Sequence, residues 1–180
     1  MNFGSILKKF IGKQKLTPVQ LAELIGPQLH RPMRKAAENI PELGDILGEG
    51  NSERIYFELA AADLSIFTAL LFKTCPNRDY AREAYSMCGT FVAVHMSEDT
   101  VFKFGYDDLA RRFKARGTEY LAVLGASPDG DYMEFAKLYS RNARLADSYL
   151  AQQLIWIEHS AHRYEEMLAT LWDQVEPVLK

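Results

Sequence analysis

Apolar residues recur along this chain at steps of three and four positions, the spacing that places side chains on one face of an α-helix. The clearest example lies between residues 150 and 175, where the apolar positions form one seam: Leu150, Leu154, Ile157, Ala161, Tyr164, Leu168, Leu171 and Val175. The same spacing predicts helices over about 53–73, 79–97 and 107–124. No segment shows the strict alternation of a convincing strand. The sequence therefore predicts an all-α fold.

The segment 16–50 predicts short helices broken by proline. Thr17 and Gln20 suit a reciprocal cap at the start of the first of these helices. We expect that helix to end at Gly26 and Pro27, because glycine favours a helix end and proline lacks the N–H that continues one.

The last helical stretch, residues 131–176, contains neither glycine nor proline. As one straight helix it would be about 69 Å long at 1.5 Å per residue. A compact domain of this size is only about 40 Å across. We therefore expect the stretch either to bend or break near Ser140–Asp147, or to protrude and pair with another copy.

A length of 180 residues fits one domain, and 48% apolar with 25% charged residues is typical of a globular protein. We predict a single all-α domain over residues 1–180, a bundle of about five or six helices. Its parts are a basic amphipathic N-terminal arm (1–15), the proline-broken helices (16–50) and the bundle body (51–180).

The two cysteines, Cys75 and Cys88, are 13 residues apart, which matches no common zinc or redox spacing. Residues 1–15 have no long apolar core and no small-residue cleavage site of the kind that a secretory signal carries. We therefore expect reduced thiols and a cytoplasmic location.

Glu158, His159 and His162 are the residues that most resemble metal ligands. On a helical wheel both histidines point away from the seam, and Glu158 lies on its flank. Di-metal bundles use Glu-x-x-His motifs that face inward from two helices, so no metal is favoured here, and Glu158 and His162 remain weak candidates. We expect these two to form an exposed i,i+4 pair. Ile155 lies on the same outer face and indicates a second contact, such as a subunit interface.

Two acids lie in the helix predicted over 53–73, which is apolar on nearly every side and therefore central. Glu58 and Asp63 must then be paired, protonated or bound to a ligand, because an isolated buried charge is too costly. His95 faces inward on its own helix, and Arg116 lies close to an apolar stripe. One interpretation is a structural network of acid, arginine and tyrosine; the other is a ligand site.

Charge is unevenly distributed along the chain, whose net charge is −3. Residues 1–35 hold seven basic residues (Lys8, Lys9, Lys13, Lys15, Arg31, Arg34 and Lys35) against Glu23. Phe3, Leu7 and Phe10 add an apolar side to the N-terminal arm. Such an arm can lie on an anionic membrane. We favour docking on its own domain or on a sister subunit, because one short helix has marginal membrane affinity.

Part of this basic region, residues 16–40, resembles the first half of the DNA-binding helix-turn-helix family. Ala22 and Gly26 have the four-residue spacing of a tight helix crossing. Pro27 occupies the turn, however, and Pro32 falls where the recognition helix needs an apolar interior residue. Nucleic-acid binding and membrane-surface binding are therefore kept as weaker alternatives.

The sequence contains no glycine-rich phosphate loop after a strand and no Gly-x-Ser-x-Gly elbow. We predict a non-enzymatic binding or scaffold protein that acts through helix surfaces and self-associates as a homo-oligomer, with no cofactor. The alternative is a metal- or small-ligand-binding protein, or an enzyme, centred on Glu58 and Asp63. That alternative predicts a pocket walled by residues 58–66 and 88–95.

Overall fold

The computed structural model describes residues 14–29, 51–98, 105–127 and 130–179, and within them the fold is all-α, as predicted. In chain order the elements are β1 (Gln14–Leu16), a helix over residues 18–29, α3 (Asn51–Thr74), α4 (Arg78–Ser97), α5 (Tyr106–Ala126), α6 (Met133–Ala143), the 3-10 turn η2 (Asp147–Tyr149), α7 (Leu150–Gln174) and β2 (Val175–Pro177). Six α-helices therefore lie in this part of the chain, which confirms the predicted number.

Two predicted regions lie largely outside the described residues. Of the basic N-terminal arm (1–15), only the last two residues are described, and they belong to β1. Of the proline-broken region (16–50), the structure describes residues 16–29. The predictions made for Pro32 and for the basic residues Arg31, Arg34 and Lys35 therefore lie outside the described residues.

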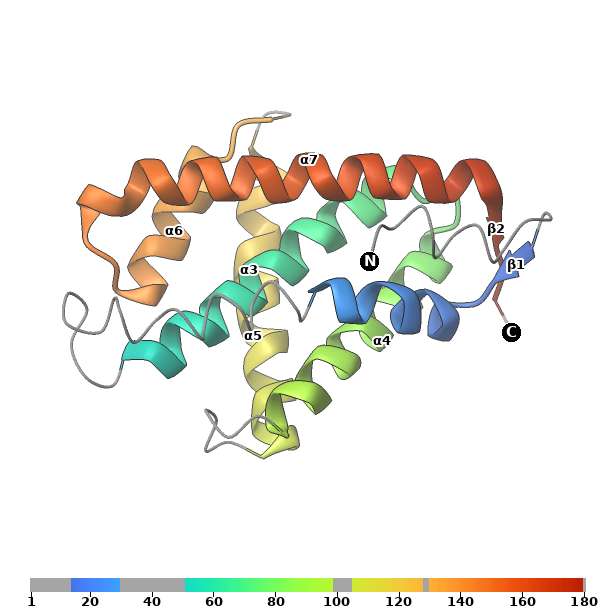
Figure 1. Ribbon diagram of the computed structural model, residues 1–180, viewed down its shortest axis with the longest axis horizontal. Coiled ribbons are helices and arrows are strands. Elements are labelled where there is room, and N and C mark those ends of the chain that lie inside the picture. The colour runs from blue at the N-terminus through green and yellow to red at the C-terminus, as the bar shows by residue number, and fades with distance from the viewer. Residues whose placement is uncertain (1–13, 30–50, 99–104, 128–129, 180) are drawn as a thin grey trace.

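α3 is the central helix of the bundle. It packs against α4, α5, α6 and α7, and its most extensive contacts are with α5 and α7 (Figure 1). Among the described helices, α3 alone is long and apolar enough over Glu53–Thr74 to cross a membrane, but 78% of its most apolar window is buried inside the molecule. The prediction of a buried central helix is confirmed.

The helix over residues 18–29 begins as predicted. The backbone N–H of Thr17 donates to Oε1 of Gln20 at 2.9 Å, and the N–H of Gln20 donates to Oγ1 of Thr17 at 3.3 Å. These reciprocal bonds satisfy donors that have no partner within the first turn.

The predicted end of this helix is wrong. The helix continues through Gly26 and Pro27 to residue 29. A Cβ at position 26 would overlap the ring of Phe91 on α4, so glycine serves here to let two helices approach closely. Ile25 and Leu29 are fully buried on either side. Their packing outweighs the backbone hydrogen bond that Pro27 removes.

A small pair of strands joins the two ends of the described chain. β1 and β2 run parallel, with Gln14 opposite Val175 and Leu16 opposite Pro177. The N–H of Val178 then donates to the carbonyl of Leu16 at 3.1 Å. These strands were not predicted, because three residues are too few to show an alternating pattern.

The final helical stretch breaks inside the predicted interval. α6 ends at Ala143, and Arg144 adopts the left-handed conformation with φ 57° and ψ 40°. The N–H of Leu145 then donates to the carbonyl of Ser140 at 2.8 Å and closes the helix end. α7 follows with 25 residues, about 37 Å at 1.5 Å per residue, and forms one long side of the molecule in Figure 1.

Candidate functional site

The outer face of α7 is as predicted. Glu158, His159 and His162 are exposed, while Ile157, Tyr164, Leu168 and the other central seam residues are buried. The predicted pairing of His162 is wrong, because its Nε2 lies 3.2 Å from Oε1 of Glu166, one turn further along the helix, and not against Glu158. Within the described residues, no group of three or more His, Cys, Asp or Glu side chains is placed to hold a metal ion.

Glu58 is buried, with 2% of its surface exposed, and both of its oxygens have partners. Tyr120 OH donates to Oε2 at 2.7 Å, and Arg116 Nη2 lies 2.7 Å from Oε1. Arg116 also pairs with Glu119. Burial raises the pKa of Glu58 above its usual value even though the bonds to Tyr120 and Arg116 lower it. The predicted network of acid, arginine and tyrosine is present here.

Asp63 is equally buried but less completely bonded. Tyr164 OH donates to Oδ2, and Arg163 Nη2 lies 3.6 Å from the same oxygen. Oδ1 has no hydrogen-bond partner among the described residues. Burial raises the pKa of Asp63 to about 6, against the lowering effects of Tyr164, Arg163 and the nearby Ser160 side chain.

The two acids belong to separate networks. A separation of five residues turns the second side chain by about 140° around the helix axis, at 3.6 residues per turn. Glu58 therefore faces α5, where Arg116 and Tyr120 lie, whereas Asp63 faces Tyr164 on α7. The structure thus brings Arg116 to Glu58, as the sequence suggested, but does not place both acids in one site.

His95 does not join either acid. Its ring stacks on Phe91 with the centroids 4.1 Å apart, and Nδ1 lies 2.9 Å from the Phe91 carbonyl oxygen. The sequence predicted that His95 faces inward, and in the structure it is half-buried. The acids face α5 and α7, whereas His95 belongs to α4. The predicted grouping of Glu58, Asp63 and His95 is therefore not observed.

A pocket of about 630 Å³ opens beside Glu58. Its walls come from the first half of α3, the middle of α5 and the end of α6. We call it the arginine pocket; it is lined by Glu53, Arg54, Phe57, Glu58, Arg112, Ala115, Arg116, Glu119, Arg141, Asn142 and Arg144. α4 contributes none of these residues. A separate pocket of about 330 Å³ does have walls from both expected segments, 58–66 and 88–95, with Leu64 on α3 and Gly89 and Thr90 on α4, but neither acid nor His95 lines it.

Positive charge dominates this pocket, since its lining contains five arginines and three glutamates among the described residues. Arg116 is neutralised by Glu58 and Glu119. Arg112 donates to Asp108 at 2.8 Å. The remaining three, Arg54, Arg141 and Arg144, form no side-chain hydrogen bond or ion pair with any residue that the structure describes. The pocket therefore has unneutralised positive charge.

Sequence analysis identified Glu58 and Arg116 but missed the other arginines. Arg112 and Arg116 are four residues apart on α5, and Arg141 and Arg144 are three apart, so each pair shares one side of its own segment. Nothing in the spacing shows that α3, α5 and α6 bring these pairs together. Taken one helix at a time, they look like ordinary solvated charges.

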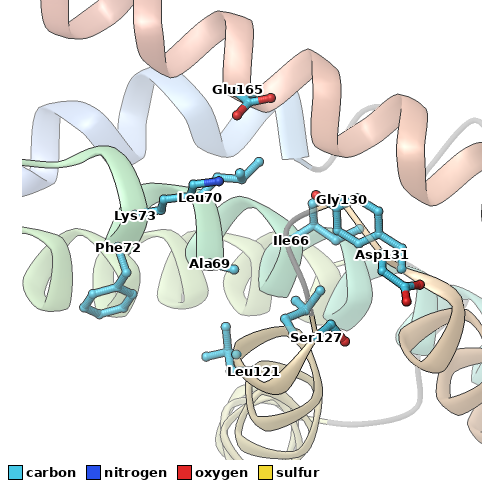
Figure 2. A pocket seen from close by; sticks show the side chains of 13 residues that line it. Ile66, Ala69, Leu70, Phe72, Lys73, Leu121, Ser127, Gly130, Asp131 and Glu165 are labelled. Atoms are coloured by element: carbon cyan, nitrogen blue, oxygen red, sulfur yellow. The ribbon is translucent and has the colours of Figure 1, made fainter.

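A second pocket, of about 670 Å³, lies between the C-terminal halves of α3 and α5 and the middle of α7 (Figure 2). Ile66, Leu70 and Leu121 give it an apolar floor. Its lining has mixed charge: Lys73 is basic, whereas Asp131 and Glu165 are acidic. It therefore lacks the single dominant charge of the arginine pocket.

Comparison with known proteins adds no family assignment: no protein-family model, curated protein or solved structure matches this chain. The ligand chemistry of the arginine pocket is therefore inferred from the residues that line it.

Proposed function

We propose that this protein is a non-enzymatic binding protein that holds an anionic ligand in the arginine pocket. One observation carries the proposal: Arg54, Arg141 and Arg144 line the same pocket, and none of them has a partner in the described part of the chain. Guanidinium groups bind carboxylate and phosphate oxygens through paired, charge-assisted hydrogen bonds. Several of them converging on one cavity favour an anion strongly.

The lining favours binding over catalysis. No described residue of the arginine pocket is His, Cys, Ser or Thr, the side chains that most often act as nucleophiles or general bases near neutral pH. Glu58, the buried acid in this pocket, is already held by Arg116 and Tyr120. Its role in the proposal is to anchor Arg116 in the pocket wall.

Isothermal titration calorimetry with inorganic pyrophosphate at low ionic strength tests this proposal. We expect pyrophosphate to bind and Arg141→Gln to weaken binding about tenfold or more, because a hydrogen bond to a charged group contributes about 1.5–3 kcal/mol. Low salt is needed because mobile ions screen exposed charges.

Arg78→Gln is the matched control. Arg78 is exposed at the start of α4 and lies outside the arginine pocket. Its replacement removes the same charge and should leave the affinity for pyrophosphate nearly unchanged. Equal weakening by both substitutions would mean that only net charge matters and would contradict a site.

Self-association through the outer face of α7 is a second candidate function. Ile155 is 66% exposed on that face, the largest exposure among the exposed apolar side chains of the described residues. Covering such a side chain with a second chain would be favourable, because apolar surface gains free energy when it is removed from water. The two proposals are compatible, since Ile155 lies outside the arginine pocket.

A further inference from the structure

We infer that the ligand of the arginine pocket is a nucleoside diphosphate or a closely similar nucleotide, with its phosphates on Arg54, Arg141 and Arg144 and its base against Phe57. This inference rests on the proposed function and adds the chemical class of the ligand.

The pocket offers guanidinium groups to more than one phosphate. Arg54, Arg141 and Arg144 have no partner in the described chain. The lining as a whole, with five arginines and three glutamates, has a net charge of +2. Two linked phosphates can present acceptor oxygens to three separate guanidinium groups more readily than one phosphate can.

The size of the pocket requires an organic part. Its volume of about 630 Å³ lies within the range of roughly 300–1,000 Å³ that is usual for sites of organic ligands. Inorganic pyrophosphate would fill only the region near the guanidinium groups. The remaining space is open to an organic group, and the lining from α3 and α5 includes apolar side chains as well as Arg54, Arg112 and Arg116.

Phe57 and Ala115 supply an apolar wall in that remaining space. The Phe57 ring is half-buried and is supported from behind by Phe113, with centroids 5.0 Å apart and ring planes at 43°. Nucleobases stack on aromatic rings and on guanidinium planes, and both kinds of surface line this pocket. A flat aromatic base therefore suits the Phe57 side better than a flexible chain.

The pocket lining also offers hydrogen-bond acceptors to a nucleotide. Glu53 and Glu119 line it on α3 and α5, the helices that carry Phe57 and Ala115. Carboxylates accept hydrogen bonds from hydroxyl and amino groups, which the ribose and the base of a nucleotide provide.

Calorimetry with three probes tests the inference on the full chain: adenosine diphosphate, inorganic pyrophosphate and adenosine, each without added metal. Adenosine diphosphate should bind at least tenfold more tightly than pyrophosphate, because a stacked base adds substantial affinity. Adenosine, which lacks the phosphates, should bind more weakly than either. Uridine diphosphate is measured in parallel, so that a preference for one base is not mistaken for absence of base binding.

Phe57→Leu separates stacking from charge. This variant should lose the advantage of adenosine diphosphate over pyrophosphate and leave the affinity for pyrophosphate within about twofold of the original. Phe57→Trp keeps an aromatic surface and should retain the advantage. Thermal unfolding followed by circular dichroism selects the variants that are folded, and the tryptophan variant keeps the test decisive if Phe57→Leu does not fold.

The outcomes distinguish failure of the nucleotide inference from failure of the proposed anion-binding function. Equal affinities for pyrophosphate and both nucleotides would overturn the nucleotide inference and leave an anion site in place. Tighter binding of a single-stranded oligonucleotide than of either nucleotide would also overturn it. No binding of any anionic probe, or no effect of Arg141→Gln on bound probes, would remove the proposed function itself.

Discussion

Asp63 and Glu58 show how the same type of residue behaves differently in one buried helix. Both oxygens of Glu58 accept hydrogen bonds, and a guanidinium group is 2.7 Å away. Asp63 has one bonded oxygen, a more distant arginine, and an Oδ1 without a partner in the described structure. Burial raises the pKa of Asp63 to about 6, because its few partners offset only part of that effect.

Asp63 should therefore make stability depend on pH. Its folded pKa of about 6 lies above the ordinary value of 3.8, so the folded protein binds the proton more tightly than the unfolded chain. The resulting contribution is complete below about pH 3.8 and is lost as pH rises through 6. A shift of about two units corresponds to about 3 kcal/mol.

Urea unfolding at pH 4 and pH 7 measures this effect. The difference in unfolding free energy between the original protein and Asp63→Asn should change by about 2.4 kcal/mol between the two pH values, because the original protein is destabilised at pH 7 by the ionised carboxylate. Asp173→Asn, at an exposed position of α7, provides the control and should follow the original protein. Parallel pH profiles for all three proteins would contradict the assignment.

The sequence could predict the burial of these acids because the helix around them is apolar on nearly every side. It could also name Arg116 as a partner, since that residue borders an apolar stripe. It could not show that Glu58 and Asp63 face different helices, because that depends on where α5 and α7 lie around α3. Residue type and periodicity describe one helix at a time.

At the scale of elements, packing overrides a local signal in the helix over 18–29. Gly26 and Pro27 together predict a helix end, yet the helix continues for two further residues. The reason is contact with α4: Gly26 lies against Phe91, and Ile25 and Leu29 are fully buried. Rules for helix ends consider neighbours in sequence, whereas the continuation of this helix through residue 29 depends on contact with a segment about 65 residues away.

Gly26→Ala should destabilise the protein, because the added methyl group overlaps the Phe91 ring. We expect a loss of about 1–3 kcal/mol in the free energy of unfolding measured in urea, the usual cost of overpacking. Gly89→Ala on α4 is the matched control, since its Cβ would meet only Leu64 Cδ2 at 3.8 Å. Alanine there should be neutral or stabilising, because it favours helix more than glycine does.

Adding Phe91→Leu to Gly26→Ala should recover part of the loss, because the smaller side chain makes room for the methyl group. If Gly26→Ala proved as stable as Gly89→Ala, the close approach of these helices would not be needed for stability.

The break between α6 and α7 was also not marked by residue type. The length of the stretch predicted either a break near Ser140–Asp147 or a protruding helix, and the structure has the break. The left-handed residue is Arg144, where glycine or asparagine is more usual, so residue type did not mark the position. The same residue then contributes its guanidinium group to the arginine pocket.

At the scale of the whole molecule, the bundle could be predicted because each helix carries its own apolar face. The arginine pocket could not be predicted, because its walls come from three helices. The outer face of α7 could be predicted in part. The helical wheel predicted that Ile155 faces outward, and in the structure it is 66% exposed. What that surface contacts stays a prediction.

We expect this surface to mediate self-association. Sedimentation equilibrium should give a mass above the 20.5 kDa of one chain. Ile155→Asp should return the protein to a monomer, because a charge buried at an interface is costly. Val19→Asp, at an apolar position of the 18–29 helix that is 48% exposed, should leave the mass unchanged. A monomeric original protein would rule this function out.

The parallel pair of β1 and β2 has a consequence for the order in which the molecule assembles. Its partners are about 160 residues apart in sequence, so closing this contact early would cost more chain entropy than any turn or helix. It can form cheaply only once the intervening helices have brought both segments together. The amide of Val178 therefore reports on this step. During refolding it should become protected from hydrogen exchange only when the complete tertiary structure has formed.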